Sequence, residues 1–404
     1  MFDCVASQPI FNTRTEIFGY ELLYRSGPDS KGYDADDHSA ATKDVIVTAF
    51  SDIGIESITA GKKAFVNFTQ DLILNETPLL LSNNILIVEL LETVEPTEEV
   101  IKACKKLKDK GYLIALDDFE FREEYLPLPE LADIVKIDFY NNDEESIRKN
   151  VKKIRSRFKK VLLAEKVETY EVVEFAKSLG CTLFQGFFYS KPRLANAKYV
   201  DTQRISKLLL LRSLAKEEVS FLELAEIIKR DVVLSYRLLN IVNSAYYGLS
   251  YSVTGILHAL TILGLNEIKK WISFILVSDI KDNKPNELIR MALIRSMFME
   301  KISIILKDRK RREEYFMVGL FSLSEAIMDS PIEAILSQTH LSESISKTLI
   351  TGQGKIADIL KIIKHIEKAE WEEMEPYMEK YNLSIKDINK CYIDAMRDAN
   401  KIMR

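Results

Sequence analysis

Cysteine, histidine and glycine are all scarce in this chain of 404 residues. The 4 cysteines lie far apart and none forms a Cys-x-x-Cys pair, so the sequence predicts neither a disulfide framework nor a structural zinc site. The 4 histidines are equally scattered, and a catalytic metal ion would therefore need oxygen ligands. With 14 glycines the chain holds about half of the usual share, which favours helices over turn-rich β folds.

Long apolar runs and an excess of basic charge are also missing. No window reaches the roughly 18 uninterrupted apolar residues of a membrane span, and the first residues do not form a signal peptide, so we expect a cytoplasmic protein without a membrane partner. The net charge of −5 argues against a globally basic nucleic-acid binder. The basic cluster LKDRKRREE (306–314) is typical of a solvated helix end or loop and lacks interleaved aromatic residues, so we expect no nucleic-acid partner.

The first half of the chain alternates short apolar runs with segments of helical length. The segments 97–111 and 168–180 each end in a glycine, which is a frequent helix stop. Continuous apolar runs suit strands that are buried on both faces, and strands that alternate with helices are typical of an α/β fold. The predicted strands are 63–68, 84–90, 112–118, 133–138 and 161–165, with further strand-like segments at 16–25 and 181–184.

The second half contains no comparable strand runs and shows helical spacing almost throughout. The sequence therefore predicts two domains, an α/β domain over residues 1–200 and an all-α domain over residues 201–404. Within the second domain, the pattern predicts helical structure over 258–280. The segment WEEMEPYMEK (371–380) is interpreted as a linker between surface helices.

Polar side chains stand at the ends of successive predicted strands. An acid within a hydrophobic strand is costly unless it is paired or ligates a cation, and the carboxyl ends of barrel strands form the catalytic face. Any one of these residues could instead cap a helix, as Asp118 and Glu168 illustrate, but six together indicate a cation site. The six are Glu21, Asn67, Glu89, Asp117, Asp118 and Glu165.

These six residues form an oxygen-only set that suits Mg²⁺, Mn²⁺ or Ca²⁺. The adjacent Asp117 and Asp118 can each direct a carboxylate to one of two ions. Two hard cations about 3.5–4 Å apart favour in-line displacement at phosphorus, and Lys136 could offset charge on the phosphate or on the attacking oxygen. The pattern thus predicts phosphodiester hydrolysis.

Seven motifs, together with SQPIF (7–11), make residues 1–195 resemble an EAL domain, the cyclic di-GMP phosphodiesterase module. They are GYELLYR (19–25), FVNFT (65–69), VELLE (88–92), ALDDF (115–119), VKID (135–138), LAEKVET (163–169) and FQGFFYSKP (184–192). The resemblance implies a TIM-like barrel whose first strand is antiparallel. It also implies conversion of cyclic di-GMP to linear pGpG with one or two Mg²⁺ or Mn²⁺ ions, and an inhibited form with Ca²⁺.

The resemblance also assigns roles to individual residues. It places the six strand-end residues as metal ligands, with Glu165 and Lys136 as catalytic residues. Substrate contacts are implied for Gln8, Arg25, Gln185 and Pro192. Supporting roles are implied for Glu92, Asp138 and Glu168. An EAL barrel of this kind often dimerises, so a homodimer is expected.

Several positions depart from the EAL pattern. The signature alanine is Leu22, the glycine after the catalytic glutamate is Lys166, and Glu120 and Arg122 replace glycines in the loop after the paired aspartates. Glycine permits positive φ and close backbone approach, which Glu and Arg do not readily allow. Two interpretations follow, weak or conditional hydrolysis and a sensor that binds cyclic di-GMP without turnover. Action on another phosphodiester is a third.

The second half resembles an HDOD domain, an output module related to HD phosphohydrolases. The resemblance is strongest over 224–248 and 258–271, and it marks Asp231, Asn243, Ser244 and Gly264. The segment GLFSLSEAI (319–327) lacks the His-Asp doublet of the hydrolases, and His258 and His340 are isolated. We therefore expect no catalysis from this half, and the resemblance implies an unidentified protein partner.

Overall fold

The computed structural model describes residues 4–25, 55–119, 121, 125–191, 219–229, 238–239, 241–243, 253, 255–278, 285–328, 331–339 and 342–403. The chain divides into two compact units. The first comprises Met1–Tyr189 together with His365–Glu373, and the second comprises Ser190–Lys364 together with Met374–Arg404. The predicted boundary at residue 200 lies outside the described residues and stays a prediction.

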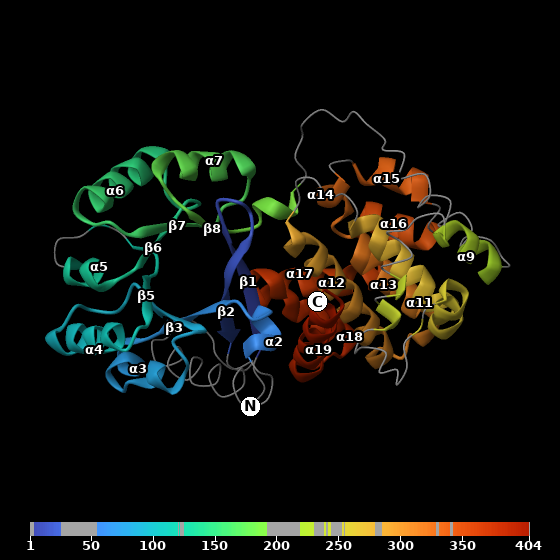
Figure 1. The fold of residues 1–404 in the computed structure, drawn as a ribbon, viewed down its shortest axis with the longest axis horizontal. Coiled ribbons are helices and arrows are strands. Elements are labelled where there is room, and N and C mark those ends of the chain that lie inside the picture. The colour runs from blue at the N-terminus through green and yellow to red at the C-terminus, as the bar shows by residue number, and fades with distance from the viewer. Residues whose placement is uncertain are drawn as a thin grey trace. The chain divides into compact units, whose positions relative to one another are not determined.

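Eight strands of the first unit close into a barrel in the order in which they follow one another along the chain (Figure 1). The first strand is antiparallel to both of its neighbours, the second and the eighth, and every other neighbouring pair is parallel. This confirms the predicted barrel with an antiparallel first strand. The strands are β1 (Cys4–Asn12), β2 (Ile17–Arg25), β3 (Lys63–Phe68), β4 (Leu86–Leu90), β5 (Leu113–Leu116), β6 (Ile134–Asp138), β7 (Val161–Glu165) and β8 (Leu183–Gln185).

A layer of buried apolar side chains packs together, with one residue from each of seven strands. The layer consists of Ile10, Phe65, Ile87, Ala115, Ile134, Leu163 and Leu183. Successive side chains of a strand point to opposite faces, so a residue two positions away lies on the same face. On each parallel strand, the residue two positions after a member of this layer therefore also faces the barrel interior. It lies next to the layer, nearer the carboxyl end of the strand.

Three longer helices connect the parallel strands, and their ends have clear local causes. In α4 (Glu98–Asp109) the hydroxyl of Thr97 accepts a hydrogen bond from the third helical N–H. In α6 (Glu144–Arg157) the side chain before the first residue caps the helix in the same way. The predicted helix at 168–180 is α7 (Tyr170–Leu179), which ends at Gly180 with φ of 93°. Shorter elements are α2 (Ile55–Thr59), α3 (Gln70–Leu74), η2 (Thr77–Leu80), α5 (Pro127–Leu131) and η4 (Phe188–Ser190).

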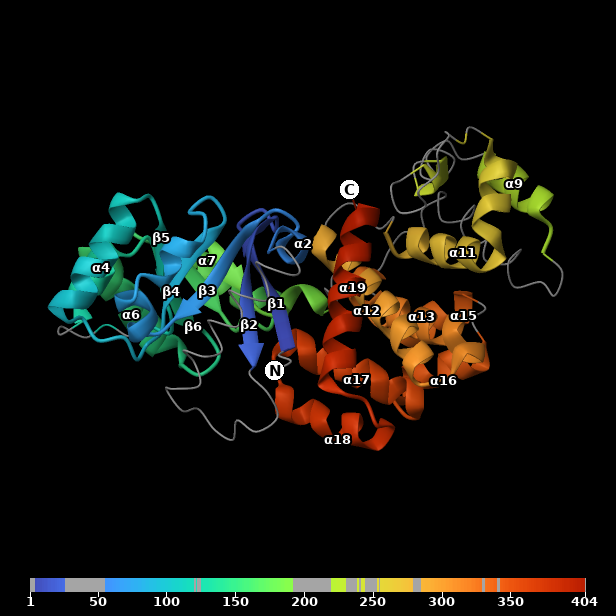
Figure 2. The same ribbon diagram turned by 90° about the horizontal axis from the view of Figure 1, so that it is seen from below.

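The described residues beyond 218 contain helices and no strand, which confirms the predicted all-α second half. The buried helix α12 (Asn286–Ile305) packs against α13 (Arg312–Phe321) and α19 (Ile385–Met403) (Figure 2). The other elements are α9 (Phe221–Lys229), α11 (Ile256–Ser278), η5 (Arg309–Arg311), α14 (Ser324–Met328), α15 (Ile332–Thr339), α16 (Glu343–Thr351), α17 (Lys355–Lys368) and α18 (Trp371–Tyr381). No helix of the described residues is long and apolar enough to span a membrane.

One sequence interpretation of this half was wrong, and one predicted helix contains a kink. The expected linker 371–380 is the helix α18, which contains Pro376. Proline normally interrupts a helix because it lacks an N–H, but the buried Met374 gives this segment an apolar contact that composition alone did not reveal. The predicted helical segment 258–280 corresponds to α11, which is kinked at Gly264, where φ of 72° and ψ of 164° are not helical.

The HDOD-like positions that fall on described residues have structural roles. The side-chain amide of Asn243 donates to the backbone oxygen of Val253 at 2.8 Å and accepts from its N–H at 2.7 Å. This pair of bonds links the side chain of Asn243 to the backbone of Val253 within the helical unit. Asp231 and Ser244 lie outside the described residues.

Candidate active site

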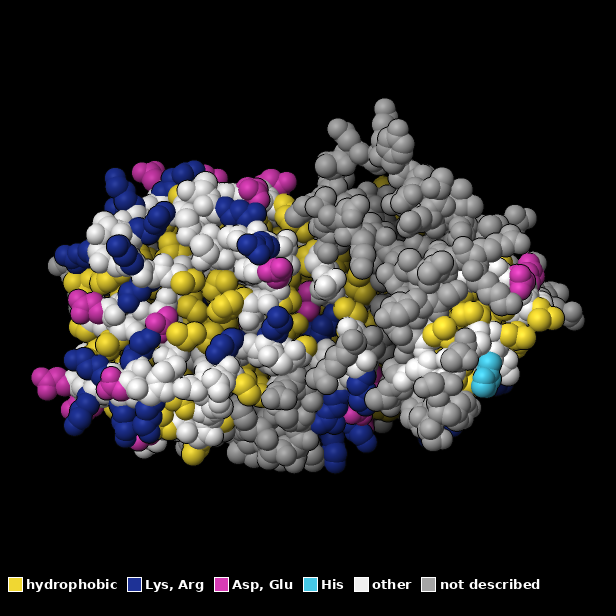
Figure 3. Space-filling model, viewed as in Figure 1, with side chains coloured by type: hydrophobic (Ala, Val, Ile, Leu, Met, Phe, Trp, Pro, Cys, Tyr) yellow, Lys and Arg dark blue, Asp and Glu magenta, His cyan; other side chains and the backbone are white. Residues whose placement is uncertain are grey.

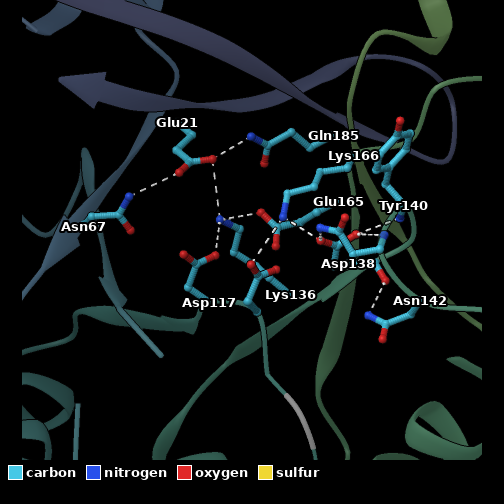
Figure 4. A network of polar contacts seen from close by, with 12 residues as sticks. Glu21, Asn67, Asp117, Lys136, Asp138, Tyr140, Asn142, Glu165, Lys166 and Gln185 are labelled. Atoms are coloured by element: carbon cyan, nitrogen blue, oxygen red, sulfur yellow. Dashed lines mark hydrogen bonds and ion pairs between the residues drawn. The ribbon is translucent and has the colours of Figure 1, made fainter. Parts of the chain in front are cut away.

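The strand pattern brings polar side chains together at one end of the barrel (Figure 4). Each of these residues stands two positions from a member of the buried apolar layer, so both face the barrel interior. On β1, which runs the opposite way, the equivalent residue precedes the layer by two. The residues placed in this way are Gln8, Asn67, Glu89, Asp117, Lys136, Glu165 and Gln185. Glu21 joins them from β2, where its Cα lies opposite that of Gln8.

The Lys136 ammonium is the centre of this cluster. Its side chain is 1% exposed, and Nζ lies 2.6 Å from Glu165 Oε1 and 2.8 Å from Asp117 Oδ1. It also pairs with Glu89 Oε1 and lies 3.5 Å from Glu21 Oε2. We call these five residues the Lys136 network. A lysine buried to this extent remains charged because four carboxylates surround it.

The Lys136 network carries more negative than positive charge. Burial alone would lower the pKa of Lys136, but Asp117, Glu165, Glu21 and Glu89 hold it well above its usual value. Burial raises the pKa of Glu89, and the neighbouring Glu21 raises it further. Burial likewise raises the pKa of Glu165. One ammonium therefore does not offset the burial of Glu89 and Glu165, and an additional cation would favour the ionised forms of these two carboxyls.

Amide side chains orient Glu21. The Nε2 of Gln185 donates to Glu21 Oε2 at 2.5 Å and to Gln8 Oε1 at 3.1 Å. From the other side, Asn67 Nδ2 donates to Glu21 Oε1 at 3.3 Å. Two of the predicted substrate-binding residues thus lie against a predicted metal ligand.

Several buried oxygens of the site have no hydrogen-bond partner within the described part of the chain. They are Glu89 Oε2, Asp118 Oδ1, Glu165 Oε2 and Gln185 Oε1. One carboxylate oxygen from each of Asp117, Asp118 and Glu165 lies within 4.8 Å of the others. Unpaired buried acceptors are costly, and clustered carboxylate oxygens are the ligands that Mg²⁺ and Mn²⁺ prefer. The donor set therefore fits a hard divalent cation.

A second ammonium, that of Lys166, lies at the edge of the site. Its Nζ is 2.5 Å from Asp138 Oδ2 (Figure 4) and 3.3 Å from Asp118 Oδ2. Burial raises the pKa of Asp138, but this effect is outweighed by the bond from Lys166 and by backbone N–H donors of Asn141 and Tyr140, so its pKa is lowered. Asp138 is thus a fixed anionic partner of Lys166 rather than a member of the Lys136 network.

Two family models cover most of the chain. The EAL domain model matches residues 35–192, and the HDOD domain model matches residues 205–339. YuxH of Bacillus subtilis is 34% identical over 407 aligned positions, which span 99% of this chain and 98% of YuxH. The chain belongs to the EAL–HDOD family.

A second full-length relative carries a functional name. The cyclic di-GMP phosphodiesterase CdgJ of Vibrio cholerae is 31% identical, over 99% of this chain and 93% of CdgJ. Among solved structures, the Bacillus subtilis YkuI protein, with an EAL domain and in complex with substrate c-di-GMP and calcium, is 18% identical. That match covers 57% of this chain and 71% of the other, with a TM-score of 0.37.

The departure from the EAL pattern at Lys166 has a conformational consequence. Lys166 has φ of 53°, in the left-handed region where the family glycine is favoured and an L-side chain is strained. Asp118 also has a positive φ, of 39°. The sequence identified Lys166 only as a lost glycine and gave no role to its ammonium, although a lysine at a glycine position beside the predicted catalytic Glu165 was a visible signal.

The loop after the paired aspartates is held by a residue that sequence reasoning missed. Asn150 of α6 donates from Nδ2 to the backbone oxygen of Phe119 at 3.0 Å and accepts at Oδ1 from the N–H of Phe121 at 3.0 Å. The cationic groups of Lys153 and Arg157 lie 5.2 and 5.6 Å from the centre of the Phe121 ring. The expected departures Glu120 and Arg122 lie outside the described residues.

Four further predicted residues are Glu92, Glu168, Arg25 and Pro192. Glu92 is exposed beyond β4, and Glu168 is half-buried between β7 and α7, where Thr169 rather than Glu168 caps the helix. The side chain of Arg25 and the whole of Pro192 lie outside the described residues. The roles expected for these four residues stay predictions.

Proposed function

We propose that this EAL–HDOD protein hydrolyses cyclic di-GMP to linear pGpG at the carboxyl end of the barrel, with Mg²⁺ or Mn²⁺ as cofactor. The observation that carries the proposal is the set of buried, unpaired oxygens on Glu89, Asp118 and Glu165 beside an excess of carboxylates. The match to CdgJ, named as a cyclic di-GMP phosphodiesterase, covers nearly the whole chain and supports the same substrate.

The proposed metal ligands are the oxygens that the strands bring together. Glu21, Asn67, Glu89, Asp117, Asp118 and Glu165 would hold one or two ions. When bound, the metal supplies Lewis acidity that polarises the phosphate and acidifies a water molecule. Glu89 and Glu165, whose pKa values burial raises, would then be ionised more fully, because a divalent charge favours their anionic forms.

The chain's own residues would move the proton and stabilise charge. The raised pKa of Glu165 suits a base that accepts a proton from the attacking water at neutral pH. Lys136, buried beside Glu165, would stabilise negative charge on the reacting phosphate or on the attacking oxygen. One water is consumed and one phosphorus–oxygen ester bond is broken, which opens the ring. Gln8, Arg25, Gln185 and Pro192 are proposed to hold the nucleotide.

A second candidate function is binding of cyclic di-GMP without turnover. The observation in its favour is the ammonium of Lys166 on Asp118, which places a fixed positive charge where a catalytic ion would need that carboxylate. Tight substrate binding with an incompletely loaded metal site gives a sensor rather than an enzyme.

The two candidates are separated by a turnover assay with a matched binding assay. The full chain is incubated with cyclic di-GMP and Mn²⁺ or Mg²⁺ while pGpG is followed, and binding is titrated in Ca²⁺. Hydrolysis requires pGpG from the wild type and at least a hundredfold less from Glu165→Gln, within the range of losses expected for a general base. The matched control Glu174→Gln, on exposed α7, keeps the wild-type rate. Binding without pGpG favours the sensor, and neither binding nor pGpG contradicts both.

We also propose that the HDOD unit binds a protein partner and that the chain forms a homodimer. The family resemblance supports both proposals. Light scattering during size-exclusion chromatography tests the dimer, and a mass of 46.4 kDa, that of one chain, would remove it.

A further inference from the structure

Lys166 connects the ends of three successive strands through a single ammonium. Lys166 follows β7, Asp138 is the last residue of β6, and Asp118 lies two residues after β5. The Nζ atom is 2.5 Å from Asp138 Oδ2 and 3.3 Å from Asp118 Oδ2. A point charge with three donors suits this shared position between two carboxylates.

Asp138 holds the ammonium in place. Its Oδ1 accepts the backbone N–H groups of Tyr140 at 2.7 Å and of Asn141 at 2.9 Å, and Asn141 Nδ2 donates to Oδ2 at 2.6 Å. The carboxylate of Asp138 is therefore fixed by its own loop. The side chain of Lys166 is 46% exposed, but its ion pair with the buried Asp138 restrains the ammonium. The restrained ammonium then lies beside Asp118.

The two carboxylate oxygens of Asp118 have different surroundings. Its Oδ2 faces the Lys166 ammonium, whereas its Oδ1 is buried and has no hydrogen-bond partner among the described residues. A carboxylate oxygen of Asp118 also lies within 4.8 Å of ligand atoms on Asp117 and Glu165. A cation bound between Asp118 and these two acids would lie near the ammonium and be repelled by it.

The backbone of Lys166 gives a second, independent indication. Its φ of 53° is one that glycine adopts without steric conflict and lysine does not. What the lysine gains in this conformation is the pair of contacts to Asp138 and Asp118. The strained conformation and the two ion pairs thus occur at the same residue.

We propose that the Lys166 ammonium takes the place of a second divalent cation at Asp118. The chain then binds one Mn²⁺ or Mg²⁺ ion tightly among the carboxylates of the Lys136 network, and a second ion only when Lys166 leaves Asp118. This inference rests on the proposed metal-dependent function and adds the stoichiometry of its cofactor. It makes Lys166 a residue that sets metal occupancy and not a general base or a metal ligand.

The test counts bound Mn²⁺ by electron paramagnetic resonance on the full chain after removal of metal with a chelator. Lys166→Gln keeps a polar side chain, one atom shorter, without the charge. Lys166→Gly removes the side chain and the strain, and Lys166→Arg keeps the charge. Lys177→Gln is the matched control, because Lys177 pairs with Glu174 on the surface of α7. Circular dichroism checks that each variant is folded.

We expect the wild type, Lys166→Arg and Lys177→Gln to bind one Mn²⁺ tightly and a second weakly. In Lys166→Gln and Lys166→Gly the second ion should bind about tenfold more tightly, a modest factor because solvent screens a half-exposed ammonium. Equal second-ion affinity in the wild type and both uncharged variants would overturn the inference and leave the proposed function standing. An absence of bound Mn²⁺ in every variant would overturn both.

Discussion

The Nζ of Lys136 lies 2.6 Å from Glu165 Oε1, and both side chains are almost completely buried in the barrel. This pair joins the two residues proposed to act on the phosphate and on the attacking water. Lys136 also neutralises part of the charge of Glu21, Glu89 and Asp117. The ammonium therefore contributes to the stability of the metal-free barrel as well as to the proposed chemistry.

Lys136→Met should destabilise the metal-free protein at pH 8. Loss of one partner from a buried ion pair typically costs about 3–5 kcal/mol, and the four carboxylates would then repel one another. The loss of Tm should be smaller at pH 5.5, because carboxyls with raised pKa values take up protons. Lys177→Met, which removes a surface pair, should cost less than about 1 kcal/mol. Equal losses for Lys136→Met at both pH values would contradict this account.

Glu89 should make the stability of the metal-free barrel depend on pH. Burial and Glu21 raise its pKa in the folded state, so the folded protein holds the Glu89 proton more tightly than the unfolded chain does. Protonated Glu89 therefore contributes to the free energy of unfolding at pH values below the ordinary carboxyl pKa. This contribution is lost as the pH rises through the pKa of Glu89 in the folded protein. We expect Tm, measured with a chelator, to fall as pH rises from 5.5 to 8.

Glu89→Gln should remove part of this pH dependence and raise Tm at pH 8 by a few degrees. The surface variant Glu174→Gln should leave the pH profile of Tm unchanged. Lys136 and Asp117 do not contribute to this change of Tm between pH 5.5 and 8. The pKa of Lys136 is raised and that of Asp117 is lowered, so both groups titrate outside this pH range. A Glu89→Gln protein with the wild-type slope of Tm against pH would disprove the assignment.

Asn150 should position the loop that follows the paired aspartates. Asn150→Ala removes two hydrogen bonds to the backbone, at Phe119 and Phe121, and should cost about 1–3 kcal/mol in free energy of unfolding. Because Asp118 directly precedes Phe119, Mn²⁺ affinity should fall as well. Asn84→Ala, at an exposed position, is the control for both measurements. Unchanged Mn²⁺ affinity in a destabilised Asn150→Ala would reduce Asn150 to a structural role.

Gly186 should be intolerant of any side chain. It has φ of 141°, and a Cβ at this position would lie 2.2 Å from the backbone oxygen of Val167 and 2.3 Å from its nitrogen. Gly186→Ala must therefore move the loop after Lys166 or the end of β8, and should cost about 2–4 kcal/mol by chemical denaturation. Gly61→Ala, at φ of 76° with no atom within 4 Å, should cost about 1 kcal/mol from strain alone. Similar losses of unfolding free energy in the two variants would contradict a steric clash at Gly186.

The barrel and its polar cluster were predictable from two features of the sequence. These are the spacing of apolar residues and the position of polar residues at the ends of apolar runs. Apolar runs such as 134–138 are strands, and the residue two places after an apolar interior residue faces the same interior. Polar side chains at the ends of such runs must then meet. Local order in the sequence was sufficient to place Glu89, Asp117 and Glu165 together.

The contacts of Lys166 and Asn150 were not predictable in the same way. Lys166 contacts Asp138 and Asp118 from a backbone conformation with positive φ. Neither the amino-acid composition nor the hydrophobic periodicity of the sequence indicates a positive φ at a non-glycine residue. Asn150 lies in the middle of α6, and its partners are backbone atoms of a loop about thirty residues earlier. The helix α18 was missed because the charged composition of this segment favoured a linker, and composition does not show that Met374 is buried.

Figure 3 shows basic and acidic side chains interspersed over one face of the barrel unit. Interspersed charge gives no broad positive field on this face, and broad positive fields are what attract nucleic acid. The concentrated charge of the molecule's first unit is instead the buried set around Lys136.

The most direct test of the account is an anomalous-difference map from crystals of the full chain soaked in Mn²⁺. The account predicts a peak at the carboxyl end of the barrel, about 2.0–2.6 Å from carboxylate oxygens of Glu89 and Glu165, where the buried oxygens now have no partner. Glu165→Gln crystals soaked in the same way should show a weaker peak. A wild-type map without a peak among these oxygens, at a Mn²⁺ concentration that supports binding in solution, would contradict the central claim.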